Sequence, residues 1–350
     1  MTTGVILLNF GEPAEPDRAE VVPYLERIFY DNRFVEGDLD EDEARERSRE
    51  LAERRAPGLI AEYEEIGGSP LTAQAGDQVA AVEAELRERG FDVAAYLGTQ
   101  FADPTIDDAV AEAKADGVDR LVGLPVYPLC GPSTTVAALR GLERAVADAD
   151  WDVPVDELSG WHRSPAYTGL RARNVREYAA DEGLDLTDSD TRLVFSAHGT
   201  PTHYLEEGSR YDTYVEEYTS VLAAQLGVEE YDLGYQNHEN RDIPWTEPEV
   251  EDVAVAVDAE RVVVEPVSFV HEQSETLSEL DLELREEVEE SGRAFYRVPI
   301  PHDDPQLIEL FADLVEPFVA GYDPAYYQLR PCQCADGDAM CLNAPRAPGR

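Results

Sequence analysis

Short apolar runs alternate with helical stretches along almost the whole chain, and turn-forming residues bound each run. This rhythm is typical of βαβ units, in which helices join parallel strands and cover the faces of the sheet. We predict strands at 4–10, 92–101, 120–128, 151–160, 191–197, 231–237, 261–270 and 293–300. We predict helices between and after them, at 76–90, 105–117, 134–149, 210–226, 247–258, 273–290 and 305–321. Two sets of four strands predict an α/β fold of two similar doubly wound lobes, each with a parallel sheet.

The predicted domains follow from this division. An N-terminal lobe spans 1–160 and a C-terminal lobe spans 161–304, with the helix at 305–321 packing back on the first lobe. The segment 36–57 is charged and helical in pattern but has no wide apolar stripe, which predicts a lid over a cleft or a solvated arm. From 322 to 350 the helical period is lost, and we predict an irregular tail that contains cysteines.

Acidic residues outnumber basic ones by 75 to 28, which gives a formal net charge of −47. Because sequence-independent binding to DNA or RNA needs Lys and Arg to neutralise phosphates, this composition excludes a nucleic-acid partner. The acidic residues are interspersed among periodic apolar segments, so we interpret the chain as a folded protein of a halophile, adapted to molar salt that screens charge repulsion. The sequence has no apolar run long enough for a membrane span and no secretory leader. We therefore expect a cytoplasmic protein, either a monomer or a homodimer.

Candidate site residues follow the predicted strands of the second half. Ligands of open α/β sheets bind outside the carboxyl ends of the strands. His198 follows one strand, and His271, Glu272 and Glu275 follow another. A histidine with several carboxylates suits the ligation of first-row metals and proton transfer near neutral pH. No H-E-x-x-H, Walker, G-x-G-x-x-G or G-x-S-x-G motif follows a predicted strand, so zinc proteases, NTPases, dinucleotide enzymes and acyl-transfer hydrolases lack support.

Three glutamates, Glu275, Glu279 and Glu283, recur at intervals of four residues. This spacing places them on one side of a predicted α-helix, where like charges repel by roughly a few tenths of a kcal/mol per pair. In so acidic a chain, the run is either solvated surface or a path for a metal ion or protons, because a bound cation or proton offsets the repulsion.

Six regions of the chain, in register and in order, resemble the motifs of ferrochelatases. They are "LLNFGEP" (7–13), "RRAPGLIAEYEEIGGSPLTAQ" (54–74), "LPVYPLCGPSTT" (124–135), "FSAHGTP" (195–201) with "LEEGSRYDTYVEEYTSVL" (205–222), "YQNHENRDIPWTEP" (235–248) and "VSFVHEQSETLSELDLE" (267–283). The resemblance covers residues 4 to 321.

This resemblance implies a lyase-class enzyme of haem biosynthesis that inserts Fe²⁺, its second substrate, into a porphyrin, either protoporphyrin IX or coproporphyrin III. It also implies two chelatase-like lobes with the flat ring in the cleft between them. The active-site histidine of the family falls on His198 and its partner glutamate on Glu275, and the acidic metal positions continue over Glu279 and Glu283. Candidate porphyrin-binding residues are Phe10, Arg54, Arg55, Tyr63, Ser69, Tyr127 and Trp245.

The chain departs from the family pattern at three places. Where the family has Asp-His before the glutamate, this chain has Glu272 and Gln273, so the acidic position is kept and the second histidine is not. Gln100 stands where a basic residue is common. Phe10 stands where relatives carry a tyrosine or a thioether, and phenylalanine cannot ligate iron.

The resemblance also gives the four cysteines a candidate role. Some ferrochelatases carry a [2Fe–2S] cluster on C-terminal cysteines and one from the body of the chain, and Cys130, Cys332, Cys334 and Cys341 would supply four thiolates. Zinc in an S₄ site and an unliganded tail are the alternatives.

Two other functions compete with iron insertion. One is a cobalt or nickel chelatase for a sirohydrochlorin-type ring, and the other is a tetrapyrrole carrier without turnover. The length of two lobes and the "SETLSELDLE" run favour iron, and the presence of both His198 and Glu275 argues against a carrier.

Overall fold

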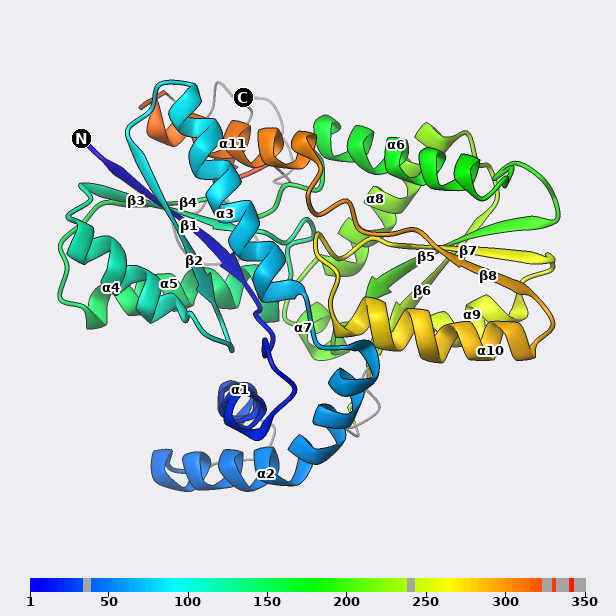
Figure 1. Cartoon of the computed structure of the whole chain (residues 1–350), viewed down its shortest axis with the longest axis horizontal. Helices are drawn as coiled ribbons and strands as arrows, with labels where there is room; N and C mark the ends of the chain where they lie inside the picture. Colours follow the sequence, from blue (N-terminus) through cyan, green and yellow to red (C-terminus); the bar gives the residue numbers. More distant parts are fainter. Residues whose placement is uncertain (34–38, 238–242, 323–328, 332–339, 343–350) are drawn as a thin grey trace.

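The computed structural model describes residues 1–33, 39–237, 243–322, 329–331 and 340–342. These residues build two parallel four-stranded sheets (Figure 1). The first contains β1 (Thr3–Asn9), β2 (Val93–Thr99), β3 (Arg120–Pro125) and β4 (Val155–Glu157) in the order β2-β1-β3-β4. The second contains β5 (Thr191–His198), β6 (Tyr231–Gln236), β7 (Arg261–Pro266) and β8 (Ala294–Arg297) in the order β6-β5-β7-β8. Both sheets therefore connect their strands in the same sequence, which confirms the predicted fold of two similar doubly wound lobes.

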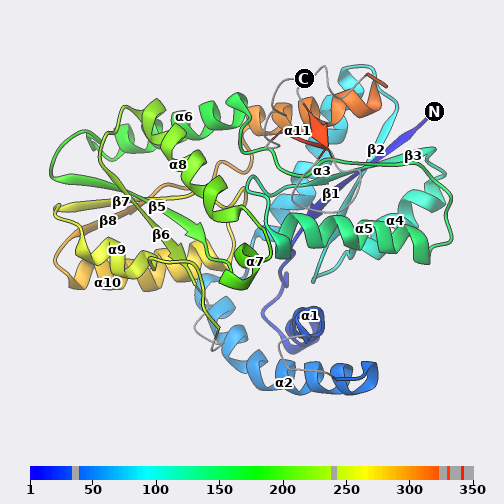
Figure 2. The ribbon, with the colours of Figure 1, turned by 180° about the vertical axis from the view of Figure 1, so that it is seen from behind.

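Helices cover both faces of each sheet (Figures 1 and 2). The first sheet lies between one layer of α3 (Leu71–Glu88) and α11 (Pro305–Val319) and another of α4 (Ile106–Asp116), the π-helix η2 (Pro132–Val136) and α5 (Ala137–Asp148). The second lies between α6 (Pro165–Asp181) with α8 (Tyr211–Leu226) and α9 (Val250–Ala256) with the π-helix η3 (Glu275–Leu284) and α10 (Arg285–Glu290). The short helix α7 (Thr202–Glu206) follows β5.

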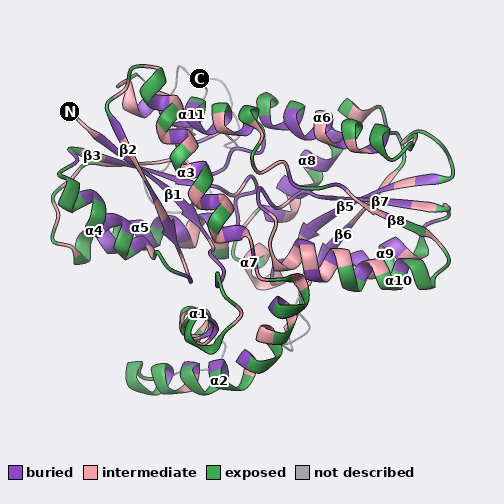
Figure 3. Ribbon diagram, in the orientation of Figure 1, coloured by how far each residue is buried: buried purple, intermediate pink, exposed green. Residues whose placement is uncertain are grey.

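The alternation of side chains along β1 explains this layering. Val5 and Leu7 join the apolar cluster that contains residues of α3 and α11, whereas Ile6 and Leu8 join the cluster with α4 and α5. Strands of parallel sheets read as continuous apolar runs because both of their faces are buried, as Figure 3 shows for the centre of each sheet. The cluster of Val5 also includes Phe195 of β5, so the two lobes share one core and hold their facing edges in a defined relation.

Two helices at the carboxyl ends of the strands, α1 (Arg18–Asp31) and α2 (Glu41–Ile66), pack on each other (Figure 1). Of the segment predicted as a lid or a solvated arm, 36–57, residues 41–57 belong to this longer helix, whose C-cap is Gly67 with φ of 80°, and residues 36–38 lie outside the described residues. The helix α2 buries Ala52, Ala56 and Tyr63 in a cluster with α1, because small side chains let the two helices approach.

Three further predictions concern the strand 151–160, the domain boundaries and the tail. The predicted strand 151–160 is reduced to β4, which begins after Pro154, a residue that has no N–H for a ladder. The predicted domain boundaries at 160 and 304 fall in connections and stay predictions. In the tail, β9 (Arg330–Pro331) and β10 (Met340–Cys341) form a short antiparallel pair, so the described part of the tail is not wholly irregular. None of the helices in the described ranges has both the length and the apolarity that a membrane span requires.

Candidate active site

His198 is the last residue of β5, at the carboxyl edge of the second sheet. Its backbone N–H donates to Ser268 Oγ at 2.8 Å, and its carbonyl oxygen accepts from the hydroxyl of Tyr211 at 2.8 Å. Its Nδ1 lies 2.7 Å from the carbonyl oxygen of Gly199. Because a carbonyl oxygen only accepts, Nδ1 carries the proton in the neutral ring and Nε2 keeps the lone pair. This tautomer suits a base or a metal ligand that acts through Nε2.

Gln236 connects the strand of His198 to the acidic helix. It is the last residue of β6, only 2% exposed, and its Cα is the register partner of His198. Its Oε1 accepts from Ser196 Oγ at 2.8 Å, which orients the amide. Its Nε2 donates to the carbonyl oxygen of Glu275 and to Glu279 Oε2, both at 2.9 Å. The imidazole and the first two glutamates of the run therefore occupy one corner, at the carboxyl ends of β5 and β6.

The run of glutamates lies on the π-helix η3, so the prediction of an α-helix over its whole length was wrong for 275–284. Polar side chains bind backbone carbonyls in the first turn, as Gln236 does at Glu275 and Thr276 Oγ1 does at Gln273 at 3.0 Å. Groups that insert into the hydrogen-bond ladder favour i→i+5 pairing over i→i+4, and such π segments are frequent at functional sites. Sequence spacing cannot distinguish the two ladders, because both keep these glutamates on one side.

The last carboxyl of the run is exposed, whereas the first two belong to partly buried residues. Glu275 is partly buried, and its Oε2 accepts from Gln273 Nε2 at 2.9 Å and lies 3.0 Å from Ser274 Oγ. Burial and, second, the charge of Glu275 raise the pKa of Glu279 well above its ordinary value. Glu283 is exposed, and partial desolvation followed by charges of α2 raises its pKa. The glutamates thus lead from the interior to the surface. In the described ranges, no three His, Cys, Asp or Glu side chains are grouped so as to hold a metal ion.

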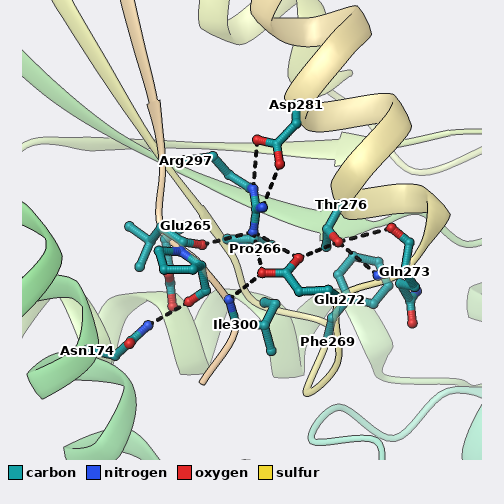
Figure 4. Close-up of polar contacts among 12 residues, drawn as sticks. Asn174, Glu265, Pro266, Phe269, Glu272, Gln273, Thr276, Asp281, Arg297 and Ile300 are labelled. Carbon is teal, nitrogen blue, oxygen red and sulfur yellow. Dashed lines mark hydrogen bonds and ion pairs between the residues drawn. The ribbon is translucent and has the colours of Figure 1, made fainter. Parts of the chain in front are cut away.

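A partly buried ion-pair network braces the outer side of this helix (Figure 4). Arg297, at the end of β8, donates to both oxygens of Glu272 at 2.8 and 3.0 Å and to both oxygens of Asp281 at 2.9 and 2.5 Å. Glu272 also accepts from Thr276 Oγ1 at 2.6 Å and from the backbone N–H of Ile300 at 2.8 Å. The carboxylates of Glu272 and Asp281 are therefore occupied in holding η3 to β8, outside the run of three glutamates.

Below this network, the fully buried Arg171 holds the exit of β7. It donates to Glu265 Oε1 at 2.8 Å and to the carbonyl oxygens of Phe269 and Pro266 at 3.0 and 2.7 Å. Since Arg171 belongs to α6, this contact ties the loop that leads into η3 to the helix layer on the other face of the sheet.

Glu12 brings a further carboxyl from the N-terminal lobe to the start of η3. It lies after β1 and is 3% exposed. It accepts hydrogen bonds from the hydroxyl of Tyr63 at 3.0 Å, from Ser69 Oγ, and from the backbone N–H of Ser274 at 3.2 Å and Ser274 Oγ. Burial and, second, the charge of Glu275 raise the pKa of Glu12 to about 7.

His271 does not face the cleft as a second catalytic histidine but joins the lobes. It is 2% exposed, with Nδ1 3.4 Å from Asn9 Nδ2 and Nε2 2.7 Å from Gln78 Oε1. Asn9 ends β1, and Gln78 lies on α3 and also donates to the carbonyl oxygen of His302 at 2.8 Å. Burial and, second, the charge of His302 lower the pKa of His271 to about 3, so the imidazole is neutral.

The candidate aromatic porphyrin contacts have different surroundings. Phe10 is partly buried beside Phe101, with ring centroids 4.7 Å apart in an edge-on arrangement. The hydroxyl of Tyr127 donates to Gln100 Oε1 at 2.8 Å, and burial followed by the charge of Glu275 raises the pKa of Tyr127. Trp245 is partly buried and forms a β-bridge with Pro201, three residues after His198.

The candidate polar contacts to the ring differ likewise. Tyr63 and Ser69 are buried, and their hydroxyls donate hydrogen bonds to Glu12. Arg54 is exposed on α2, and Arg55 pairs with Glu62 at 2.8 and 3.0 Å.

Two of the four candidate cluster cysteines lie in the described part of the chain. Cys130 follows β3, and Cys341 lies in β10 with its Sγ 3.6 Å from the carbonyl oxygen of Gly160. Both are buried, and Cys130 belongs to the core that the lobes share. Cys332 and Cys334 fall outside the described residues.

Comparison with known proteins identifies the family of the chain. The sequence model of the ferrochelatase family matches residues 2–318. The chain is similar to the ferrochelatase of Synechococcus sp. strain JA-3-3Ab, with 32% identity over 335 residues that cover 93% of this chain and 96% of the relative. It is 35% identical to the ferrochelatase of Picosynechococcus sp. strain PCC 7002 over 324 residues, which cover 89% of this chain and 81% of the relative.

Among solved structures, the sirohydrochlorin chelatase SirB of Bacillus subtilis in complex with cobalt has a TM-score of 0.52 at 10% identity, with 92% of this chain and 97% of SirB covered. At that identity the likeness shows the shared chelatase fold alone. The family match over nearly the whole chain and the relatives above 30% identity show more: this chain belongs to the ferrochelatase family.

Proposed function

We propose that this protein inserts Fe²⁺ into a porphyrin at the corner where β5, β6 and η3 meet. The observation that carries the proposal is the link through Gln236, which places His198 on one strand end beside the glutamates of the π-helix. The reaction replaces two pyrrole protons by one Fe²⁺, so the site must take up protons and strip water from a dication.

His198 is proposed as the proton acceptor. With Nδ1 donating to Gly199, Nε2 is the nitrogen that would take a pyrrole proton, and the contacts of Ser268 and Tyr211 keep the backbone of this residue in place. The metallated product then leaves with neither pyrrole proton, and both must pass from the site to water.

The glutamates of η3 are proposed as the route for iron, for protons, or for both. Burial and, second, the charge of Glu275 raise the pKa of Glu279, and a dication bound beside these carboxylates would relieve their repulsion. Glu275 stands at the inner end beside the proposed ring site, and Glu283 stands at the surface. An Fe²⁺ ion that moves along the run of glutamates needs only a few carboxylate ligands at each position.

The proposed ring contacts are the residues that the family motifs supplied. Phe10, Tyr127 and Trp245 are partly buried and suit the faces of a flat ring. Arg54 and Arg55, on α2 at the carboxyl ends of the strands, are proposed partners of the ring propionates, and Arg55 would exchange Glu62 for a propionate. Tyr63 and Ser69 are proposed to support the pocket wall through Glu12.

The test is anaerobic insertion of Fe²⁺, followed as loss of porphyrin fluorescence, with wild type compared with His198→Ala. The proposal expects turnover by wild type and a loss of about a hundredfold or more in the variant. If both proteins bind the ring and neither metallates it, the protein is a carrier. Faster insertion of Co²⁺ or Ni²⁺ into sirohydrochlorin would support the other chelatase activity. Turnover on protoporphyrin IX and on coproporphyrin III identifies the native ring.

We further propose that Cys130, Cys332, Cys334 and Cys341 hold a [2Fe–2S] cluster. Support comes from the burial of Cys130 and Cys341, which shields their thiolates from water. When bound, such a cluster would tie the tail to the N-terminal lobe. A purified protein without colour, iron or labile sulfide would rule this out, and zinc in its place would support the S₄ alternative.

We also propose a lyase-class enzyme that works in the cytoplasm as a monomer or homodimer. Cell fractionation and the mass in solution test the last two points.

A further inference from the structure

We propose that Glu12 is a positioning residue of the active site, which holds the first turn of the acidic π-helix, and with it Glu275, against the N-terminal lobe. The inference rests on the proposed function, because Glu275 matters only if iron insertion takes place beside it. Glu12 comes from the loop after β1, whereas η3 follows β7 in the other lobe, so the contact joins the two lobes.

The hydrogen bonds of Glu12 converge from three segments. Tyr63 belongs to α2, Ser69 to the turn before α3, and Ser274 stands directly before η3. Each carboxylate oxygen accepts from one hydroxyl of the N-terminal lobe and from one donor of Ser274: Oε1 from Tyr63 and Ser274 Oγ, and Oε2 from Ser69 and the Ser274 N–H. The N-terminal lobe therefore fixes the position of the Glu12 carboxylate, and the carboxylate fixes the start of η3 in the other lobe.

Ser274 transmits this contact to the site. Its N–H is one of the first donors of the helix, which have no partner inside a helix and must find one elsewhere. Its hydroxyl lies within hydrogen-bonding distance of Glu12 and also 3.0 Å from Glu275 Oε2. Glu12 and Gln236 thus fix the start of η3 from two sides, Glu12 at Ser274 and Gln236 at the carbonyl of Glu275.

The chemistry of this position argues for a function. An acidic side chain that is 3% exposed is costly to bury when, among the described residues, its hydrogen-bond partners are neutral donors and include no arginine or lysine. The raised pKa of Glu12 reflects this cost. The two carboxylate oxygens of Glu12 nevertheless accept hydrogen bonds from both lobes at once, which no other part of this side chain can do.

The experiment compares Glu12→Ala, Glu12→Gln and Ser274→Ala with Glu15→Ala, which removes an exposed carboxyl from the same loop. Glutamine can keep all four contacts. Its oxygen can face the Ser274 N–H and Ser69, and its NH₂ can face Tyr63 and Ser274 Oγ, whose hydroxyls can turn to accept. Positioning therefore predicts that Glu12→Gln keeps kcat within about threefold of wild type. Glu12→Ala should lose about tenfold or more in kcat, because small displacements of reacting groups are expensive in rate.

Two further readouts separate positioning from a purely structural role. A structural role would lower the unfolding midpoint of Glu12→Ala and leave kcat per folded molecule equal to that of Glu15→Ala, which would overturn the proposal. Positioning predicts a larger fall in kcat than change in KM for the porphyrin. It also predicts that Ser274→Ala, which keeps the backbone donor, lowers kcat and adds little when combined with Glu12→Ala. Equal losses in Glu12→Gln and Glu12→Ala would also overturn it, since charge would then matter more than geometry.

The outcome for wild type separates this inference from the proposed function. If wild type turns over and Glu12→Ala matches Glu15→Ala, only the inference fails. If wild type binds the ring without metallation, the proposed function fails, and crystal structures of Glu12→Ala and wild type decide the inference. A first turn of η3 displaced from Gln236 supports it, and an unchanged first turn overturns it.

Discussion

Acidification should loosen the joint between the lobes through His271. Burial lowers the pKa of this imidazole from 6.5 to about 3, so the folded protein leaves it neutral throughout mildly acidic conditions. The unfolded chain binds a proton at an ordinary histidine pKa. The folded state therefore has its full stability above the unfolded value and loses it as the pH falls through 6.5 toward the folded value.

The size of the effect follows from the shift. At pH 6.5 the unfolded chain is about half protonated at this residue, and near pH 5 it is almost fully protonated, while the folded protein stays neutral. Because a full proton of difference is worth about 1.4 kcal/mol per pH unit, His271 should cost about 1.5–2 kcal/mol of unfolding free energy over this interval.

The assay is denaturant unfolding at both pH values for wild type and His271→Gln. Glutamine can still meet Asn9 and Gln78 but does not titrate, so carboxyl groups elsewhere contribute equally to both proteins and cancel in the difference. We expect wild type to lose about 1.5–2 kcal/mol more than His271→Gln on acidification. His203→Gln, which alters a partly exposed histidine on α7, is the control and should follow wild type. Parallel curves for wild type and His271→Gln would show that the imidazole is not held neutral by burial.

Three further predictions follow from the site. Gln236→Leu removes the donor to Glu275 and Glu279 at similar volume and should lower kcat about tenfold, and unchanged turnover would contradict the role of this link. Arg297→Met leaves the carboxylates of Glu272 and Asp281 without their cation and should lower the unfolding free energy by about 3–5 kcal/mol. The control Arg285→Met, at a side chain 39% exposed, should cost under about 1 kcal/mol. Equal losses would show that the Arg297 ion pairs do not stabilise the fold. For Glu12, the raised pKa means that stability is present below its ordinary value of 4.5 and is lost as the pH rises through about 7, so Glu12→Gln should raise the thermal midpoint more near pH 8 than near pH 5, and an equal gain at both would refute the burial effect.

Some site residues were predictable because local pattern carries the information. A parallel strand buried on both faces reads as an apolar run, so the end of β5, where His198 lies, could be predicted without coordinates. The family motifs then added Glu275 and the glutamates beyond it. The π-helical ladder could not be predicted, because it depends on Gln236, a residue 39 positions away that binds the carbonyl of Glu275.

Other residues carried no sequence signal of their role. Glu12 follows a strand like many polar residues, and its contacts with Tyr63, 51 positions away, and with Ser274, 262 positions away, exist only in the fold. Its position after a strand suggested that His271 belongs to the site, whereas in the structure its ring contacts Gln78 of α3 and connects the two lobes.

The amino-acid sequence by itself determined the two-lobed α/β architecture, the membership of a metal-chelatase family and the strand ends where chemistry takes place, since hydrophobic period and local motifs encode these. Tertiary structure alone decided which carboxyls are available. Glu272 and Asp281 are bound by Arg297, Glu12 is bound by donors of both lobes, and Glu279 is bound through Gln236. The physical reason is that the state of a carboxyl depends on burial and on partners distant in the chain, which residue spacing does not record.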